Sequence, residues 1–130
     1  GFGWDDNKWT DKPYRKVLDQ WFPDQPVALS RCDAHALWVN SVALKHAGIG
    51  PTTEVKGGRI DRDATGEPTG LLIDTAMELV EAHIPKPTAF EVRRNLLKGV
   101  QIFNEAGYTH IRDMTMDAVQ WNEALKLDSA

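Results

Sequence analysis

The stretch from Arg31 to Ile49 constrains the fold of this chain more than any other. Val, Leu and Arg alternate with Ala, Ser and Cys over 26–32, and this alternation predicts a strand. Asp33 has the chemistry of a helix N-cap, and apolar residues at helical spacing predict a helix over 34–47 that ends at Gly48. Polar side chains are therefore expected at a strand-to-helix junction, where α/β proteins often hold ligands.

Other signals along the chain predict a small set of further elements. Residues 1–12 are expected to form a polar loop that carries two tryptophans. Turn residues between two short runs predict a hairpin in which Gly66 has a positive φ. Thr88 and Glu91 have the spacing of a capping box at the start of a long helix. The expected elements are helices over 13–22, 73–83, 88–106 and 117–127, and strands over 58–63, 68–73 and 108–112.

These elements predict the fold class α/β (α+β), with a small sheet flanked by helices. The sheet is expected to come from 26–32, 58–63 and 68–73. The flanking helices are expected over 34–47, 73–83 and 88–106. A chain of 130 residues has the length of one ordinary domain, so we expect a single domain over residues 1–130.

The charge balance excludes two classes of partner. The net charge is −4, with 15 basic and 19 acidic residues mixed along the chain, and no basic stripe is present. Nucleic acid and anionic membranes are therefore not expected as partners. No apolar run approaches the roughly 20 residues that a membrane-spanning helix needs. The single cysteine, Cys32, cannot form an internal disulfide, which favours a cytoplasmic location.

Patterns that bind metal are weak in this sequence. The acids and glycine of 61–66 match the opening of a calcium loop, but Leu72 stands where that loop needs a bidentate acid, and turn chemistry explains these residues without an ion. The four histidines form neither an H-x-H nor an H-E-x-x-H pair. On the predicted helix, His35 and His46 would share a face but lie ~16 Å apart. No metal ligand is therefore predicted in this chain.

Asp33 and His35 are the candidate functional residues at the predicted junction. Asp33 also has a structural explanation, because an N-cap accepts the amide hydrogen of His35 or Ala36. His35 in a first helical turn would lie near the positive end of the helix dipole, which disfavours its protonated form. A neutral imidazole there could contact a substrate or bond to a neighbouring loop. Cys32 is expected to be a small buried residue, and no residue is assigned a catalytic role.

Several pieces of the sequence have the order and spacing of one enzyme family over nearly the whole chain. They are Gly3-Trp4-Asp5, Leu18-Asp19, Pro26-Val27, Arg31-Cys-Asp-Ala-His-Ala-Leu-Trp-Val-Asn-Ser-Val-Ala-Leu44, Ala47-Gly-Ile49, Gly58-Arg-Ile-Asp-Arg-Asp63, Gly66-Glu-Pro-Thr-Gly-Leu-Leu72 and Gly107-Tyr-Thr-His-Ile-Arg-Asp-Met114. Together they resemble family 3 of the metal-dependent amidohydrolases, the branch that includes N-substituted formamide deformylase-like proteins.

The resemblance implies a barrel enzyme in which zinc or a similar divalent metal activates water to attack amide-like C–N bonds. The ligands of that family are an H-x-H pair, a lysine or acid at mid-barrel, two further histidines and a late aspartate, and none can be placed in this chain. The chain resembles a segment inserted early in the barrel, and it would end in one barrel strand, from His110 to Asp113, and its following helix.

The resemblance also assigns a role to four residues. In the parent enzyme, Trp4, Arg31, Asp33 and His35 are expected to bind the substrate by shaping or approaching its pocket, without binding the metal. Ala34 stands where the family pattern usually has glycine, so the tight backbone at that position is expected to be altered.

Three functional hypotheses follow. The leading one is a fragment of a family-3 amidohydrolase that contributes residues to the pocket for a small amide-like substrate and is inactive alone. The second is a non-enzymatic interaction module, because a segment that normally packs against a barrel would expose apolar surface and could associate with itself. The third and weakest is a stand-alone metal hydrolase that takes ligands from a partner chain.

Overall fold

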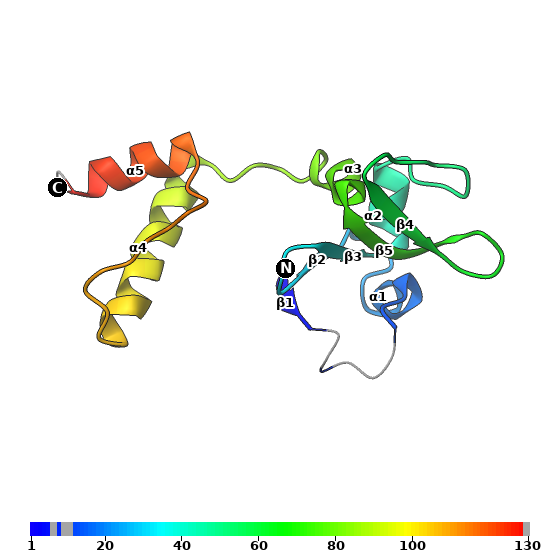
Figure 1. Ribbon diagram of the computed structural model, residues 1–130, viewed down its shortest axis with the longest axis horizontal. Coiled ribbons are helices and arrows are strands. Elements are labelled where there is room, and N and C mark those ends of the chain that lie inside the picture. The colour runs from blue at the N-terminus through cyan, green and yellow to red at the C-terminus, as the bar shows by residue number, and fades with distance from the viewer. Residues whose placement is uncertain (6–7, 9–11, 129–130) are drawn as a thin grey trace. The chain divides into compact units, whose positions relative to one another are not determined.

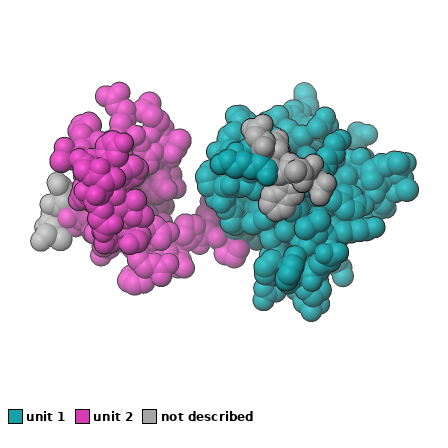
Figure 2. All heavy atoms as spheres, turned by 90° about the horizontal axis from the view of Figure 1, so that it is seen from below, with its two compact units in different colours: residues 1–84 teal, residues 85–130 magenta. Residues whose placement is uncertain are grey.

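The computed structural model of this protein describes residues 1–5, 8 and 12–128, and the chain forms two compact units. Unit 1 is Gly1–Ile84 and unit 2 is Pro85–Ala130 (Figure 2). A single domain over residues 1–130 stays a prediction. No helix among the described residues is long and apolar enough to cross a membrane.

Unit 1 is built on a five-stranded mixed sheet, which confirms the predicted α+β fold class (Figure 1). The strand order is β1-β2-β3-β5-β4, in which β1 and β2 are parallel and the other neighbours are antiparallel. The strands predicted over 26–32, 58–63 and 68–73, the last two forming the predicted hairpin, are present in unit 1, and β1 and β3 are additional. The strands are β1 (Phe2–Trp4), β2 (Ala28–Arg31), β3 (Ala36–Val39), β4 (Gly58–Arg62) and β5 (Pro68–Asp74).

The largest difference from the sequence prediction lies in 34–47, where a single helix was expected. The segment instead forms a tight turn, the strand β3 and the short helix α2 (Ser41–His46). All four residues of β3 are buried: Leu37 and Val39 belong to one core cluster, whereas Ala36 and Trp38 belong to the other. A strand buried on both faces has a continuous apolar run, and its periodicity does not distinguish it from a buried helix.

Asn40 separates the strand β3 from the helix α2. Its side chain is fully buried, and its amide makes four hydrogen bonds. The oxygen accepts from the backbone amides of Val27 and Ala43, each at 3.0 Å. The nitrogen donates to the carbonyl oxygens of Phe22 at 3.0 Å and Gln25 at 2.7 Å. Asn40 is therefore both the true N-cap of α2 and the anchor of the segment that leads into β2.

The C-terminal end of α2 agrees with the prediction. Gly48 has a φ of +65°, and its amide donates to Lys45 O at 3.2 Å. The amide of Ile49 donates to Leu44 O at 2.9 Å, and Ile49 is buried. This pair of bonds is a Schellman motif, which satisfies the last helical carbonyls.

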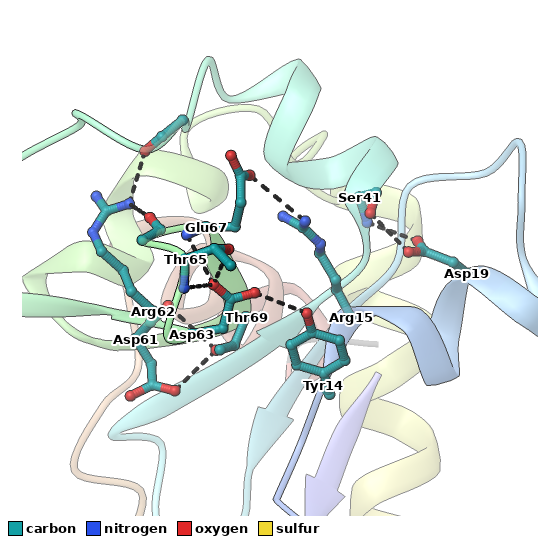
Figure 3. A network of polar contacts seen from close by, with 12 residues as sticks. Tyr14, Arg15, Asp19, Ser41, Asp61, Arg62, Asp63, Thr65, Glu67 and Thr69 are labelled. Carbon is teal, nitrogen blue, oxygen red and sulfur yellow. Dashed lines mark hydrogen bonds and ion pairs between the residues drawn. The ribbon is translucent and has the colours of Figure 1, made fainter.

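The short helix α1 (Arg15–Trp21) confirms the predicted helix over 13–22 and connects two other elements (Figure 3). Asp19 accepts hydrogen bonds from the amide and the hydroxyl of Ser41, at 2.8 and 2.7 Å, at the start of α2. The hydroxyl of Tyr14 donates to Asp63 at 3.1 Å in the turn of the β4–β5 hairpin. These bonds hold α1 against the sheet.

Asp63 shows why 61–66 has the pattern of a calcium loop. Its Oδ1 accepts from the amide and hydroxyl of Thr65, at 2.9 and 2.6 Å, and from the amide of Glu67 at 3.1 Å (Figure 3). The Thr65 hydroxyl, helped by these amides, lowers the pKa of Asp63 to about 2. Gly66 has the predicted positive φ, of +87°. The acid and the glycine of this loop therefore serve the hairpin turn.

Helical elements cover both faces of the sheet in unit 1 (Figure 1). The 3₁₀ turn η1 (Thr75–Met77), the helix α3 (Glu78–Glu81) and α2 pack on one face, with Ala76, Met77 and Val80 in the core. On the other face, Leu18 of α1 packs with Trp4 and Trp38. The predicted helix over 73–83 begins later than expected, because β5 continues to Asp74.

The predicted polar loop over 1–12 is wrong at its start, where Phe2–Trp4 forms β1. Pairing with β2 brings the backbone of this segment into the sheet, and the Trp4 side chain is buried. Residues 6–7 and 9–11 of the predicted loop, which include the second tryptophan, lie outside the described residues.

Unit 2 consists of the helices α4 (Ala89–Glu105) and α5 (Ala118–Asp128). The capping box of Thr88 and Glu91 is present as predicted. The Glu123 side chain, 3% exposed, pairs with Arg93 at 2.7 Å and joins the two helices. The predicted strand over 108–112 is wrong: this exposed segment is irregular, because none of the described residues of unit 2 forms a strand with which it could pair.

Replacing Asn40 with aspartate tests its role in the fold. Asn40→Asp removes two donors from buried carbonyl oxygens and places an unpaired carboxylate in the core, so unit 1 should lose about 3–5 kcal/mol of its free energy of unfolding. Urea denaturation followed by tryptophan fluorescence measures the loss. The matched control is Asn104→Asp on the exposed surface of α4, and equal effects of the two changes would contradict the anchoring role.

Candidate functional site

The four residues predicted to bind substrate come together at one end of the sheet in unit 1. Residues 32–35 form the turn that joins β2 to β3, and the amide of Ala34 closes it by donating to Arg31 O at 2.9 Å. The amide of Cys32 donates to Trp4 O at 2.9 Å and ties this turn to the end of β1. Two strand ends and a hairpin turn therefore carry the candidate site.

Trp4 and Arg31 are partners in the register between β1 and β2. The Arg31 guanidinium lies 5.9 Å from the centre of the Trp4 ring, within the range of a cation–π contact. Trp4 is 8% exposed, its Nε1 donates to Leu29 O at 2.7 Å, and its ring meets Trp38 edge-on at 6.2 Å. Trp4 is thus a core residue whose ring also contacts the Arg31 guanidinium.

Arg31 and Asp33 form a bidentate ion pair within the turn. Nε and Nη2 of Arg31 each donate to one carboxylate oxygen of Asp33 at 2.8 Å. This guanidinium, helped by the amide of His35 at 3.0 Å, lowers the pKa of Asp33 to about 2. Asp33 does accept the predicted amide of His35, but its role as a helix N-cap is wrong, because no helix follows it.

His35 is the most exposed of the four residues, with 72% of its side chain accessible. Its Nδ1 lies 3.3 Å from Oδ1 of Asp74, the last residue of β5. The expected effect of a helix dipole on His35 is wrong, since the residue sits in a hairpin turn. The expectation that His35 and His46 share a helix face is wrong for the same reason, since only His46 lies in α2.

Asp74 is a site residue that the sequence reasoning missed. It directly follows the predicted strand over 68–73, so its place at a strand end was the available signal. It was not recognised because Asp74 and its neighbour in space, His35, were both assigned to predicted helices, over 73–83 and 34–47. The structure instead pairs Ala36 with Ile73 in the sheet, which brings the two side chains to the same edge.

Two neighbours of His35, Ala34 in the chain and Asp74 in space, have a strained backbone. Ala34 has a φ of +62° and Asp74 a φ of +52°, and they are the non-glycine residues with positive φ among those described. Such conformations cost about 1–3 kcal/mol each and collect at functional sites. Cys32, in the same turn, is exposed, so its expected burial is wrong. It lies past the end of β2, where the chain already turns outward.

The residues at this site do not fit a catalytic metal. Among the described residues, no three histidine, cysteine, aspartate or glutamate side chains lie close enough to hold an ion. His35 and Asp74 supply two donors, whereas a catalytic zinc site takes three protein ligands. The other histidines lie in α2, after α3 and in 108–113.

Unit 2 carries an apolar groove between α4 and the segment that precedes α5. Its volume is about 800 Å³, and the apolar stripe predicted for the long helix supplies much of its wall. Residues of the segment predicted to be a barrel strand supply another part. The groove is lined by residues that include Val92, Leu96, Phe103, Ile111, Met116 and Trp121.

The amidohydrolase family model matches residues 1–127. This chain belongs to the amidohydrolase family. A putative amidohydrolase of Bacillus subtilis (strain 168), YtcJ, is 39% identical in an alignment 120 residues long, which covers 88% of this chain and 23% of that protein. LONG AFTER FAR-RED 3 of Arabidopsis thaliana is 37% identical in an alignment 131 residues long, which covers 95% of this chain and 22% of that protein.

The name of a third relative states a reaction. The N-substituted formamide deformylase of Arthrobacter pascens is 42% identical over 71 residues, which are 54% of this chain and 13% of that enzyme. This amidohydrolase-family chain therefore spans less than a quarter of the length of these relatives.

Solved structures support the fold of the amidohydrolase chain. Uncharacterized metal-dependent hydrolases from Pyrococcus horikoshii and Pyrococcus furiosus match 99% of this chain, with TM-scores of 0.63 and 0.60. Each is 21% identical to it, and the matched part is 25% of each solved chain. At this level of identity the likeness shows a shared fold alone.

The positive φ of Ala34 predicts a stabilising substitution. Ala34→Gly removes the cost of a left-handed alanine, of which part is offset by the greater freedom of glycine in the unfolded chain, so the free energy of unfolding should rise by about 0.5–1 kcal/mol. Urea denaturation measures the gain. The control is Ala36→Gly in β3, which should lose about 1 kcal/mol. A loss at both positions would contradict the strained turn.

Proposed function

We propose that this chain is a segment of a metal-dependent amidohydrolase that acts on non-peptide, amide-like C–N bonds, and that Trp4, Arg31, Asp33 and His35 line its substrate pocket. The observation that supports this proposal is the continuous set of contacts from the Trp4 ring through Arg31 and Asp33 to the exposed His35. The family membership supplies the reaction class.

The proposed roles follow from the contacts. The buried Trp4 ring packs against the Arg31 guanidinium. The Arg31–Asp33 ion pair keeps the turn in one conformation, because a bidentate guanidinium–carboxylate pair fixes both side chains. His35 projects from that turn with most of its ring accessible, so it is the residue that meets a small amide.

The proposed chemistry needs a metal, and the described residues do not group three candidate metal ligands together. A metal-bound hydroxide is the nucleophile that a metal hydrolase supplies. Zinc or a similar divalent ion would be bound by residues of a family-length protein outside this segment, which is why we propose that the segment alone is inactive. The proposed setting is the cytoplasm, and the proposed partner is a small amide-like substrate rather than nucleic acid or membrane.

Binding and turnover by the 130-residue chain test the proposal. We expect N-butylformamide and N-butylacetamide to shift the NMR signals of residues 31–35 and Asp74 at millimolar concentration. The shifts should be lost in His35→Ala and retained in the control His46→Ala. With added zinc or manganese, no amine should be released from either amide.

Two results would contradict different parts of the proposal. Binding that is absent, or that survives His35→Ala, would contradict the role of the turn in the pocket. Metal-dependent release of butylamine by the chain would contradict its inactivity and would favour a stand-alone metal hydrolase.

The apolar groove of unit 2 favours one alternative, a module that associates with itself. Several residues near or in this groove, including Phe103, Val100 and Trp121, are between 43% and 57% exposed. Exposed apolar patches of this kind promote association. Light scattering over a concentration series separates the alternatives, because a chain that stays monomeric would count against self-association.

A further inference from the structure

Asp74 occupies a backbone position that glycine would fill at lower cost. Its φ of +52° and ψ of −128° lie in a region that L residues rarely adopt. The position is fixed by the sheet, since β5 ends here and the 3₁₀ turn η1 begins at Thr75. A side chain that is kept at such a position, at a cost in backbone energy, points to a task for the side chain itself.

The contacts of Asp74 identify that task. Among the described residues, the hydrogen bond of its carboxylate is to Nδ1 of His35, at 3.3 Å. A second bond joins the same two residues through the backbone, because the amide of Asp74 donates to His35 O at 3.2 Å. His35, which directly precedes β3, and Asp74, which ends β5, are thus joined by two hydrogen bonds.

This bond fixes the state of a neutral His35 ring. A carboxylate accepts hydrogen bonds and does not donate them, so the proton of a neutral imidazole must be on Nδ1. The other nitrogen, Nε2, is then an acceptor. We propose that Asp74 is a positioning residue that holds His35 in its Nδ1–H form, so that Nε2 accepts a hydrogen bond from the N–H group of an amide-like ligand.

The ligand class in this inference rests on the proposed function, whereas the tautomer of His35 rests on the geometry alone. An imidazole nitrogen that only accepts selects ligands with a donor, so a secondary amide fits and a tertiary amide of the same size does not. The inference therefore predicts a preference of this turn for amides that retain an N–H group.

The tautomer can be read without any ligand. Long-range ¹H–¹⁵N correlation spectra of the ¹⁵N-labelled chain at pH 8 distinguish a protonated from an unprotonated ring nitrogen. We expect His35 to show a protonated Nδ1 and an unprotonated Nε2. His83 is the internal control, because its Nδ1 lies 3.0 Å from the carbonyl oxygen of Leu79 and is likewise held as a donor.

Asp74→Gly separates the role of the side chain from that of the backbone. Glycine accepts the positive φ without strain, so the variant should be at least as stable as the original chain. It removes the acceptor, so the ring of His35 should become a mixture that includes the form with the proton on Nε2, while His83 is unchanged. Asp74→Asn has the shape of aspartate but adds an NH2 group that can donate to an unprotonated Nδ1, so this variant should also weaken the preference for the Nδ1–H form.

The ligand arm compares N-butylformamide with N-butyl-N-methylformamide. The secondary amide should bind the original chain more tightly, and Asp74→Gly should weaken its binding about 2–10-fold, the value of one hydrogen bond. The tertiary amide should bind Asp74→Gly and the original chain equally.

Each contrary result has a distinct meaning. An Nε2–H form of His35 in the original chain, or a tautomer that Asp74→Gly leaves unchanged, would overturn the positioning role of Asp74. Equal binding of the secondary amide to the original chain and Asp74→Gly would overturn the ligand preference. Failure of both amides to bind the original chain would contradict the proposed function and the ligand preference, whereas the tautomer result would stand.

Discussion

The buried side-chain amide of Asn40 is the interaction on which the rest of unit 1 depends. It uses both of its donors and two acceptor positions on backbone groups from two segments, 22–27 and the first turn of α2. A buried amide that is fully hydrogen-bonded specifies one arrangement, because any other leaves polar groups unpaired in the core. Asn40 therefore fixes where β3 ends, and with it the register of the hairpin that carries the candidate site.

The site follows from that register. Once β3 is paired with both β2 and β5, the turn over 32–35 and the end of β5 lie at one edge of the sheet. The Arg31–Asp33 pair then holds the turn, and Asp74 meets His35. Strain at Ala34 and Asp74 is the cost of this arrangement, and the well-packed strands beneath them supply the stability that sustains it.

Local signals in the sequence predicted local structure well. The capping box at Thr88, the helix end at Gly48 and the turn at Gly66 were all predicted, because each depends on a few neighbouring residues. The prediction for 34–47 failed because a strand that is buried on both faces lacks the alternation of apolar and polar residues that identifies a strand. Asp33 and His35 were singled out by their place at a predicted junction, and a family resemblance added Trp4 and Arg31. Asp74 required the pairing of β3 with β5, which no local pattern reveals.

Backbone NMR of residues 28–47 tests the central claim, that Asn40 divides this segment into a strand and a helix and so places His35 in a turn. The account predicts extended ¹³C chemical shifts over 36–39, helical shifts over 41–46, and cross-strand NOEs between Leu29 and Trp38. Continuous helical shifts from 34 to 47, without NOEs between Leu29 and Trp38, would contradict the account and remove the structural basis of the site.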